Sequence, residues 1–144
     1  PMMFGGHLYT VNGVSGTSAY TFSGYNADGT DASDPALYLI AGHTYVFYLQ
    51  YDNGSHPFAI RTGGSASSGG TNLVSGNGGN NLIHISTNGT VTTGTSANTK
   101  TEGFLIWKVP HFATANTGTY RYICTSHPSN MVGSITIKTL EQLS

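Results

Sequence analysis

Apolar and polar positions alternate in short stretches along the chain, a pattern that is typical of β-strands. In residues 43–51, Tyr45, Phe47 and Leu49 occupy every second position. Because successive side chains of a strand point to opposite sides of a sheet, this stretch predicts a strand with a core face and an outer face. Comparable stretches predict strands at residues 7–11, 19–22, 36–40, 57–61, 81–86, 104–109, 119–124 and 134–138.

Turn-forming and polar residues separate these stretches. Gly, Asn and Asp predict a turn at residues 52–55 and a loop over residues 25–35. The Gly-, Ser- and Asn-rich residues 63–79 predict a surface loop, and residues 87–99 are a second polar stretch. Many short strands joined by turns predict an all-β sandwich, and the chain length suits a single domain over residues 1–144.

Charged residues make up only 8% of the chain, against about 25% in typical soluble domains. The net charge is −1, and the five Lys and Arg residues form no cluster. Nucleic-acid binding requires clustered basic residues, so it is not expected, and electrostatic steering of a charged partner is expected to be weak. No apolar stretch approaches the ~20 residues that a bilayer span needs.

The chemically informative segment lies near the C-terminus. In its predicted strand, Tyr122 and Cys124 lie on one face, and a tight loop then brings His127 and Met131 near the thiol. A thiolate, two imidazoles and a weak axial thioether form the ligand set of blue-copper sites. The second imidazole must come from a distant strand, and the candidate is His56, which follows the predicted turn.

This segment has the pattern Gly-x-Tyr-x-Tyr-x-Cys-x-x-His-x-x-x-Met-Val-Gly, and it resembles the copper-ligand segment of cupredoxins, especially of plastocyanin-like domains. Residues 35–47 and 107–110 resemble other strands of the same family, so the resemblance covers residues 35–61 and 103–138. The pattern is carried by Gly118, Tyr120, Tyr122, Cys124, His127, Met131, Val132 and Gly133.

The resemblance implies a cupredoxin-like Greek-key β-sandwich with a type 1 copper site. The metal ligands that it implies are His56, Cys124, His127 and Met131. Residues 54–60, with the Gly- and Ser-rich insert that follows, are similar to plastocyanin-like domains of marine microbial and bacteriophage proteins. Many of those domains lie within larger surface or virion proteins.

Two departures from the family pattern concern the site. The His-x-x-x-Met spacing between His127 and Met131 is one residue shorter than in plastocyanin and one longer than in amicyanin, so the axial contact has less support than the other three. Pro57 follows His56 where many cupredoxins have Asn. Because proline has no backbone N–H, we expect one hydrogen bond that tunes the cysteine sulfur to be missing.

Plainer interpretations of these residues stay open. A single buried cysteine is usually a small apolar side chain. A cupredoxin fold can also carry an empty site, or hold zinc through Cys124, His56 and His127. The other histidines show no ligand pattern, and His84, which alternates with Ile83 and Ile85, is predicted to face solvent.

The leading functional hypothesis is a one-electron carrier whose redox partner docks on an uncharged patch near His127. The alternative is a structural or adhesive module of a virion or cell surface, contacting neighbouring subunits, with copper as a stabilising staple. An enzyme is not expected, because four protein ligands leave no open position on the metal.

The expected localisation depends on whether the protein is an electron carrier or a structural module. Residues 1–6 have no cationic start and no long apolar stretch, so they are not an intact signal peptide, although a removed signal would leave the same sequence. A mature electron carrier would be extracytoplasmic, that is, periplasmic or secreted, and a phage structural protein would be part of the virion. The lone Cys124 excludes an internal disulfide and does not identify the compartment.

Overall fold

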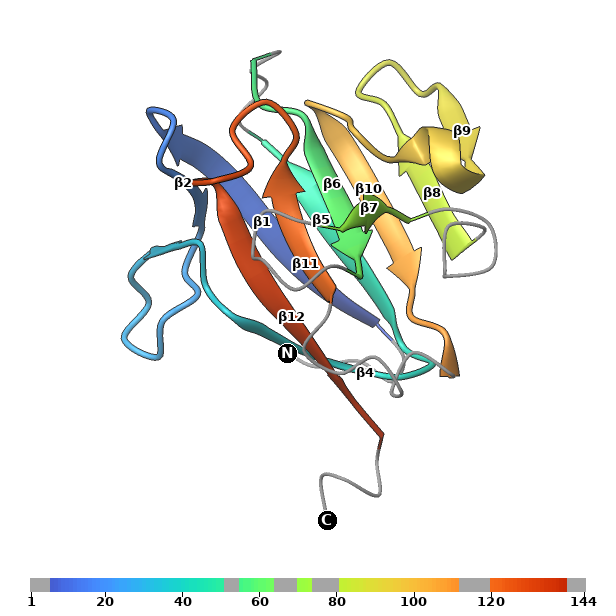
Figure 1. The fold of residues 1–144 in the computed structure, drawn as a ribbon, viewed down its shortest axis with the longest axis horizontal. Coiled ribbons are helices and arrows are strands. Elements are labelled where there is room, and N and C mark those ends of the chain that lie inside the picture. Colours follow the sequence, from blue (N-terminus) through green and yellow to red (C-terminus); the bar gives the residue numbers. More distant parts are fainter. Residues whose placement is uncertain (1–5, 51–54, 64–69, 74–80, 112–119, 140–144) are drawn as a thin grey trace.

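The alternating stretches of the sequence form strands in two facing β-sheets (Figure 1). This computed structural model describes residues 6–50, 55–63, 70–73, 81–111 and 120–139. A short 3-10 helix, η2 (Gly94–Ala97), follows strand β9. The strands are β1 (Gly6–Ser15), β2 (Ala19–Phe22), β3 (Ala32–Ser33), β4 (Leu37–Ile40), β5 (Thr44–Leu49), β6 (Phe58–Thr62), β7 (Thr71–Asn72), β8 (Leu82–Ile85), β9 (Val91–Thr93), β10 (Gly103–Lys108), β11 (Tyr120–Cys124) and β12 (Val132–Lys138).

The two sheets are both mixed. The seven-stranded sheet has the order β3-β2-β1-β5-β10-β8-β9, and the five-stranded sheet has the order β4-β12-β11-β6-β7. Most neighbours are antiparallel, but β1 pairs with β5 in parallel, and β4 pairs with β12 in parallel. The chain therefore passes repeatedly from one sheet to the other, and the predicted all-β sandwich is confirmed.

The strands predicted from alternation are confirmed, but the two segments predicted to be loops and the second polar stretch contain further short strands. Residues 25–35 contain β3, residues 63–79 contain β7, and residues 87–99 contain β9 and η2. Each short strand pairs with the edge of the strand before it, and two or three residues are too few to show a period. Most of the predicted turn at residues 52–55, much of residues 63–79, and Gly118 lie outside the described residues.

The prediction that His84 faces solvent is wrong. Its side chain is only 2% exposed, whereas Ile83 beside it is 37% exposed. Alternation along a strand shows that neighbours face opposite ways, but it does not show which face is buried. His84 is accommodated inside because its Nε2 lies 2.6 Å from the carbonyl oxygen of Glu102, which satisfies a buried polar atom.

Aromatic rings fill the space between the two sheets around Tyr122. The ring of Phe58 stacks on Tyr122 with centroids 5.7 Å apart, and the Tyr122 hydroxyl donates a hydrogen bond of 2.6 Å to the carbonyl oxygen of Pro35. On β12, Gly133 pairs with Tyr122, and a Cβ atom at this position would overlap the tyrosine ring. The position opposite Tyr122 therefore requires glycine for lack of space.

We expect Gly133→Ala to destabilise the fold, because the added methyl group must displace a ring that is packed on its other side. Overpacking of this kind typically lowers the free energy of unfolding by about 1–3 kcal/mol. The matched control is Gly13→Ala on β1, where an added Cβ meets no atom within 4 Å. Denaturant unfolding of both variants measures the difference. Equal midpoints for the two variants would show that Tyr122 has room to move.

Asp34, in the loop before β4, bonds to the backbone of β2 and to that of β12. The backbone N–H of Tyr20 donates a hydrogen bond of 2.9 Å to its Oδ1, and the backbone of Val132 also bonds to its carboxylate. Burial raises the pKa of Asp34 to about 6, against the lowering effect of these hydrogen bonds. The folded protein therefore favours the protonated acid more than the unfolded chain does.

This shift has a defined sign for stability. A raised pKa contributes stability below the ordinary value of 3.8, and that contribution is lost as the pH rises through about 6. We expect Asp34→Asn to remove this part of the pH dependence, because asparagine stays neutral and tolerates the positive φ of 45° at this position. Urea unfolding at several pH values between the two pKa values measures it, and parallel curves for the variant and the wild type would contradict the assignment.

Candidate metal centre

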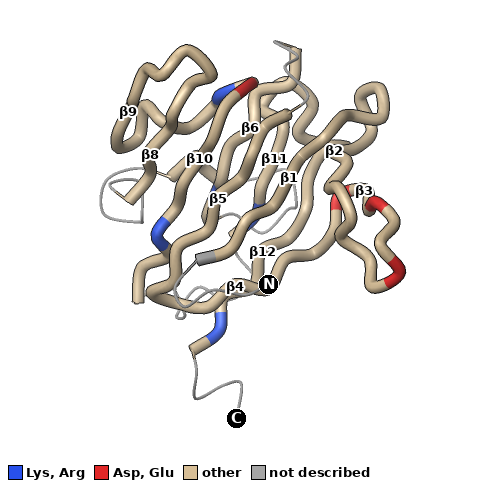
Figure 2. The backbone as a smooth tube through the Cα atoms, turned by 180° about the vertical axis from the view of Figure 1, so that it is seen from behind, with Lys and Arg blue, Asp and Glu red and all other residues tan. Residues whose placement is uncertain are grey.

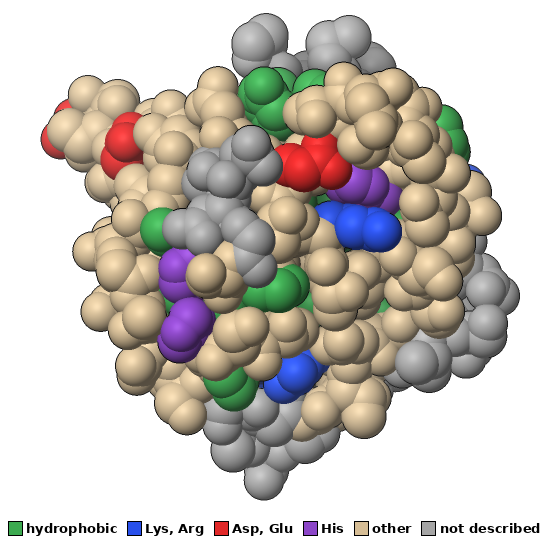
Figure 3. Space-filling model, turned by 90° about the horizontal axis from the view of Figure 1, so that it is seen from above, with side chains coloured by type: hydrophobic (Ala, Val, Ile, Leu, Met, Phe, Trp, Pro, Cys, Tyr) green, Lys and Arg blue, Asp and Glu red, His purple; other side chains and the backbone are tan. Residues whose placement is uncertain are grey.

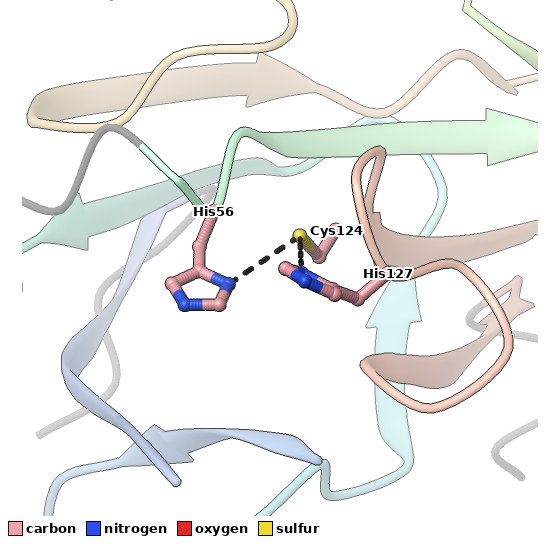
Figure 4. A group of neighbouring side chains, drawn as sticks. All are labelled: His56, Cys124 and His127. Atoms are coloured by element: carbon pink, nitrogen blue, oxygen red, sulfur yellow. Dashed lines mark hydrogen bonds between the residues drawn. The ribbon is translucent and has the colours of Figure 1, made fainter. Parts of the chain in front are cut away.

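The pairing of β6 with β11 positions the predicted ligands. These strands are antiparallel neighbours, so the start of β6 lies beside the end of β11, and Cys124 pairs with Phe58. His56 lies two positions before Phe58, and His127 lies in the loop that follows Cys124. The three side chains converge at one end of the sandwich, as Figure 4 shows.

The distances within this cluster suit one metal ion. The Sγ atom of Cys124 lies 3.7 Å from Nδ1 of His56 and 3.5 Å from Nδ1 of His127. A metal about 2.1 Å from each nitrogen and about 2.3 Å from the sulfur requires N–S separations of roughly 3.6–3.8 Å for tetrahedral to trigonal angles. The potential ligand atoms all lie within 4.8 Å of one another. A soft thiolate with two imidazoles is a donor set suited to copper.

Backbone hydrogen bonds close the loop that carries His127 and Met131, two of the predicted ligands. The N–H of Cys124 donates to the carbonyl oxygen of Met131 at 2.9 Å, and the N–H of Met131 donates to the carbonyl oxygen of His127 at 3.0 Å. Met131 lies in this closed loop with its side chain fully buried. The structure thus brings the three predicted nitrogen and sulfur donors together and places Met131 in the same loop.

The loop is also tied to the segment before β6, which carries His56. The N–H of Thr125 donates a hydrogen bond of 3.0 Å to the carbonyl oxygen of Pro57. Pro57 has neither the N–H nor the side-chain amide of an asparagine, but its carbonyl oxygen supplies a tie between the two ligand segments. This contact involves only backbone atoms, so the sequence could not indicate it.

Tyr20 is a positioning residue that the sequence did not reveal. Its side chain is fully buried, and its hydroxyl donates a hydrogen bond of 2.8 Å to the carbonyl oxygen of His56. This bond holds the backbone of the first ligand segment against β2. Nothing in the local sequence of residues 19–22 signals a partner 36 residues away.

The surroundings shield most of the cluster from water. His56 is 5% exposed and Cys124 is fully buried, while His127 is half-buried. Burial, and then the neighbouring ring of His127, lower the pKa of His56, which favours the neutral imidazole that a metal requires. Figure 3 shows this end of the molecule from above, with histidine side chains reaching a surface on which charged side chains occupy only small areas.

Within the described residues, His56, Cys124 and His127 form the one group of at least three His, Cys, Asp or Glu side chains close enough to share an ion. The remaining histidines join no such group in that part of the chain, and His84 is bonded to a backbone carbonyl. The same described part of the chain holds no helix with the length and hydropathy that crossing a bilayer requires.

No protein-family model matches the sequence, and no curated protein matches it. Several solved structures of rusticyanin are similar to the chain. A reduced rusticyanin is 19% identical with a TM-score of 0.42, and the match covers 92% of this chain and 78% of that one. A rusticyanin described as a copper protein is 16% identical with a TM-score of 0.43, covering 96% and 86%. The rusticyanin from Thiobacillus ferrooxidans is 17% identical with a TM-score of 0.41, covering 92% and 76%.

The chain's own strand pairing and side chains carry the assignment of its fold. Two mixed sheets face each other, and a cysteine at the end of β11 meets a histidine before β6 and a second histidine in the following loop. This chain is an all-β sandwich of two mixed sheets with a side-chain cluster suited to copper at one end.

Proposed function

We propose that the protein binds one copper ion in a type 1 site and transfers single electrons through it. The observation that carries the proposal is the pair of short separations, 3.7 Å and 3.5 Å, between one buried sulfur and the Nδ1 atoms of two histidines. His56, Cys124 and His127 are the equatorial ligands in this proposal. Met131 is the axial ligand, supported by its burial within the same closed loop.

Bound copper supplies reversible exchange between Cu(I) and Cu(II), and the residues here favour that chemistry over catalysis. A sulfur donor suits Cu(I), whereas imidazoles suit both states. Four protein ligands leave no position for a substrate. The hydrogen bonds from Tyr20 to His56 and from Thr125 to Pro57 hold the ligands without using any metal-binding atom, so little rearrangement accompanies a change of charge.

The partner in this proposal is a redox protein that docks beside His127. Among the three ligands of the cluster, His127 is the most exposed, and its neighbours Ser126, Pro128, Ser129 and Asn130 carry no charge. Weak redox complexes use small interfaces, so a patch of this size is adequate. The alternative, a structural or adhesive module of a virion or cell surface, stays a prediction. In that alternative, copper would only stabilise the fold and would transfer no electrons.

The direct test is a titration of the reduced protein with Cu(II), followed by its visible spectrum. We expect an intense thiolate-to-copper band, because Cys124 is the sulfur donor, and loss of that band in Cys124→Ser. The matched control is His111→Gln, which changes an exposed histidine outside the cluster and should keep the band. A colourless wild type with an intact fold would overturn the electron-carrier proposal.

Pro57 provides a test of how the site is tuned. We expect Pro57→Asn to raise the reduction potential, because a new backbone N–H beside the thiolate stabilises its negative charge and favours Cu(I). One hydrogen bond of about 1 kcal/mol corresponds to a rise on the order of 40 mV for a one-electron couple. A redox titration monitored through the visible band measures the change. An unchanged potential, with the band intact, would show that the new N–H does not reach the sulfur.

A further inference from the structure

The outer face of the seven-stranded sheet carries a row of aliphatic side chains that crosses four strands. The strand registers pair Leu8 with Val46, Val46 with Ile106, and Ile106 with Ile83. Residues paired in this way point to the same side of a sheet. Their neighbours along each strand, such as Phe47 and Leu105, point inward and are fully buried, so this row faces away from the core.

A second apolar row lies beside the first. Tyr48 pairs with Phe104, Phe104 pairs with Ile85, and Ile85 pairs with Val91. The rings of Tyr48 and Phe104 stack with their centroids 4.5 Å apart. The first row is thus aliphatic, and the second is aromatic at its centre. We call these eight residues the outer apolar face: Leu8, Val46, Ile83, Ile106, Tyr48, Ile85, Val91 and Phe104.

The outer apolar face is exposed and uncharged. Leu8 is 58% exposed and Val91 is 59% exposed at its margins, while Ile83 and Phe104 near its centre are 37% and 36% exposed. Threonines extend both rows, and Lys108, paired with Thr44, lies in the next row. Figure 2 looks onto this side. Strands β1, β5, β8 and β10 are free of the colours that mark charged residues there, apart from the end of β10. Single exposed apolar residues are ordinary, whereas a continuous apolar patch, such as this set on five paired strands, is often functional.

We propose that the outer apolar face binds the same face of a second copy of this chain. A partner chosen by charge would find no counter-charge in either row, whereas a second copy presents an equally uncharged surface. Two copies of one face meet through a two-fold axis. An axis that runs between the rows places the aliphatic row of one copy over the aromatic row of the other, so that flat rings meet aliphatic side chains. Sheets that pack in this way lie about 10 Å apart.

The small area of the face argues against a permanent dimer. Two rows across five strands, spaced about 4.8 Å apart, cover roughly 300 Å² in projection. A standard stable interface buries about 800 Å² on each partner. The face with its threonine rim is therefore smaller than a standard interface, and a weak, concentration-dependent dimer is the consequence.

Self-association through this face does not depend on the proposed copper function. The outer apolar face contains none of the residues His56, Cys124, His127 or Met131, and these candidate ligands lie where β6 begins and β11 ends. Dimer formation leaves the surface around His127 free for a partner. Loss of the copper proposal would thus leave the dimer proposal standing, and the reverse also holds.

The test is sedimentation equilibrium of the full chain, under reducing conditions, from about 10 µM to about 1 mM, where weak complexes dissociate. We expect reversible dimerisation of the wild type, weakened at least about tenfold by Phe104→Lys, because a buried unpaired charge opposes association. Ile83→Lys is a second variant in the other row. The matched control is Tyr38→Lys on β4, which changes an apolar residue 65% exposed on the opposite sheet and should leave dimerisation unchanged.

Circular dichroism and thermal unfolding of each variant establish that its fold is intact, and the second variant serves if one does not fold. A monomeric wild type over the whole range would overturn the proposal. Dimerisation that resists both face variants, or that Tyr38→Lys abolishes equally, would also overturn it. Binding of a monomeric wild type to vesicles of neutral phospholipid, lost in the face variants, would assign the face to a lipid surface instead.

Discussion

The antiparallel pairing of β6 with β11 is the constraint on which the candidate metal centre depends. Its register places Cys124 opposite Phe58, and this brings His56 within 3.7 Å of the thiol sulfur. A slip of one residue would turn Cys124 to the other face of the sheet. All five residues of β11 are buried, so both faces of the strand resist such a slip. The Tyr122 ring against Gly133 fixes the register with β12 as well.

The segments that carry the candidate ligands are held by groups outside the His56–Cys124–His127 cluster. Backbone bonds from Cys124 to Met131 and from Thr125 to Pro57, with the Tyr20 hydroxyl on His56, connect four segments of the chain. Because these bonds satisfy buried polar atoms, their loss would cost more than an exposed hydrogen bond. The arrangement of donors is therefore a property of the folded chain, and an ion that fits it adds stability without having to create the site.

The sequence predicted what periodicity and motif spacing can carry. The strands with several alternating residues were predictable, and the order of His56, Cys124, His127 and Met131 indicated the site. The short strands β3, β7 and β9 were not, since a neighbouring edge sets their pairing. His84 was assigned to the wrong face because alternation does not show which face of a strand is buried. The buried partner of His84, the carbonyl oxygen of Glu102, could not be seen in the sequence. Contacts between distant backbone atoms, such as the carbonyl of His56 with Tyr20, leave no local signal.

A shortage of charge links the two surfaces that we propose as interfaces. With only 8% charged residues, the chain offers neither the loop around His127 nor the outer apolar face a counter-charge for a partner. Electrostatic complementarity mainly sets association rate and rejects wrong partners. Where it is absent, discrimination must come from shape and from the match of apolar side chains. The loop beside His127 is small, whereas the sheet face is broad and regular, so the same composition favours a brief redox contact at one surface and a face-to-face contact at the other.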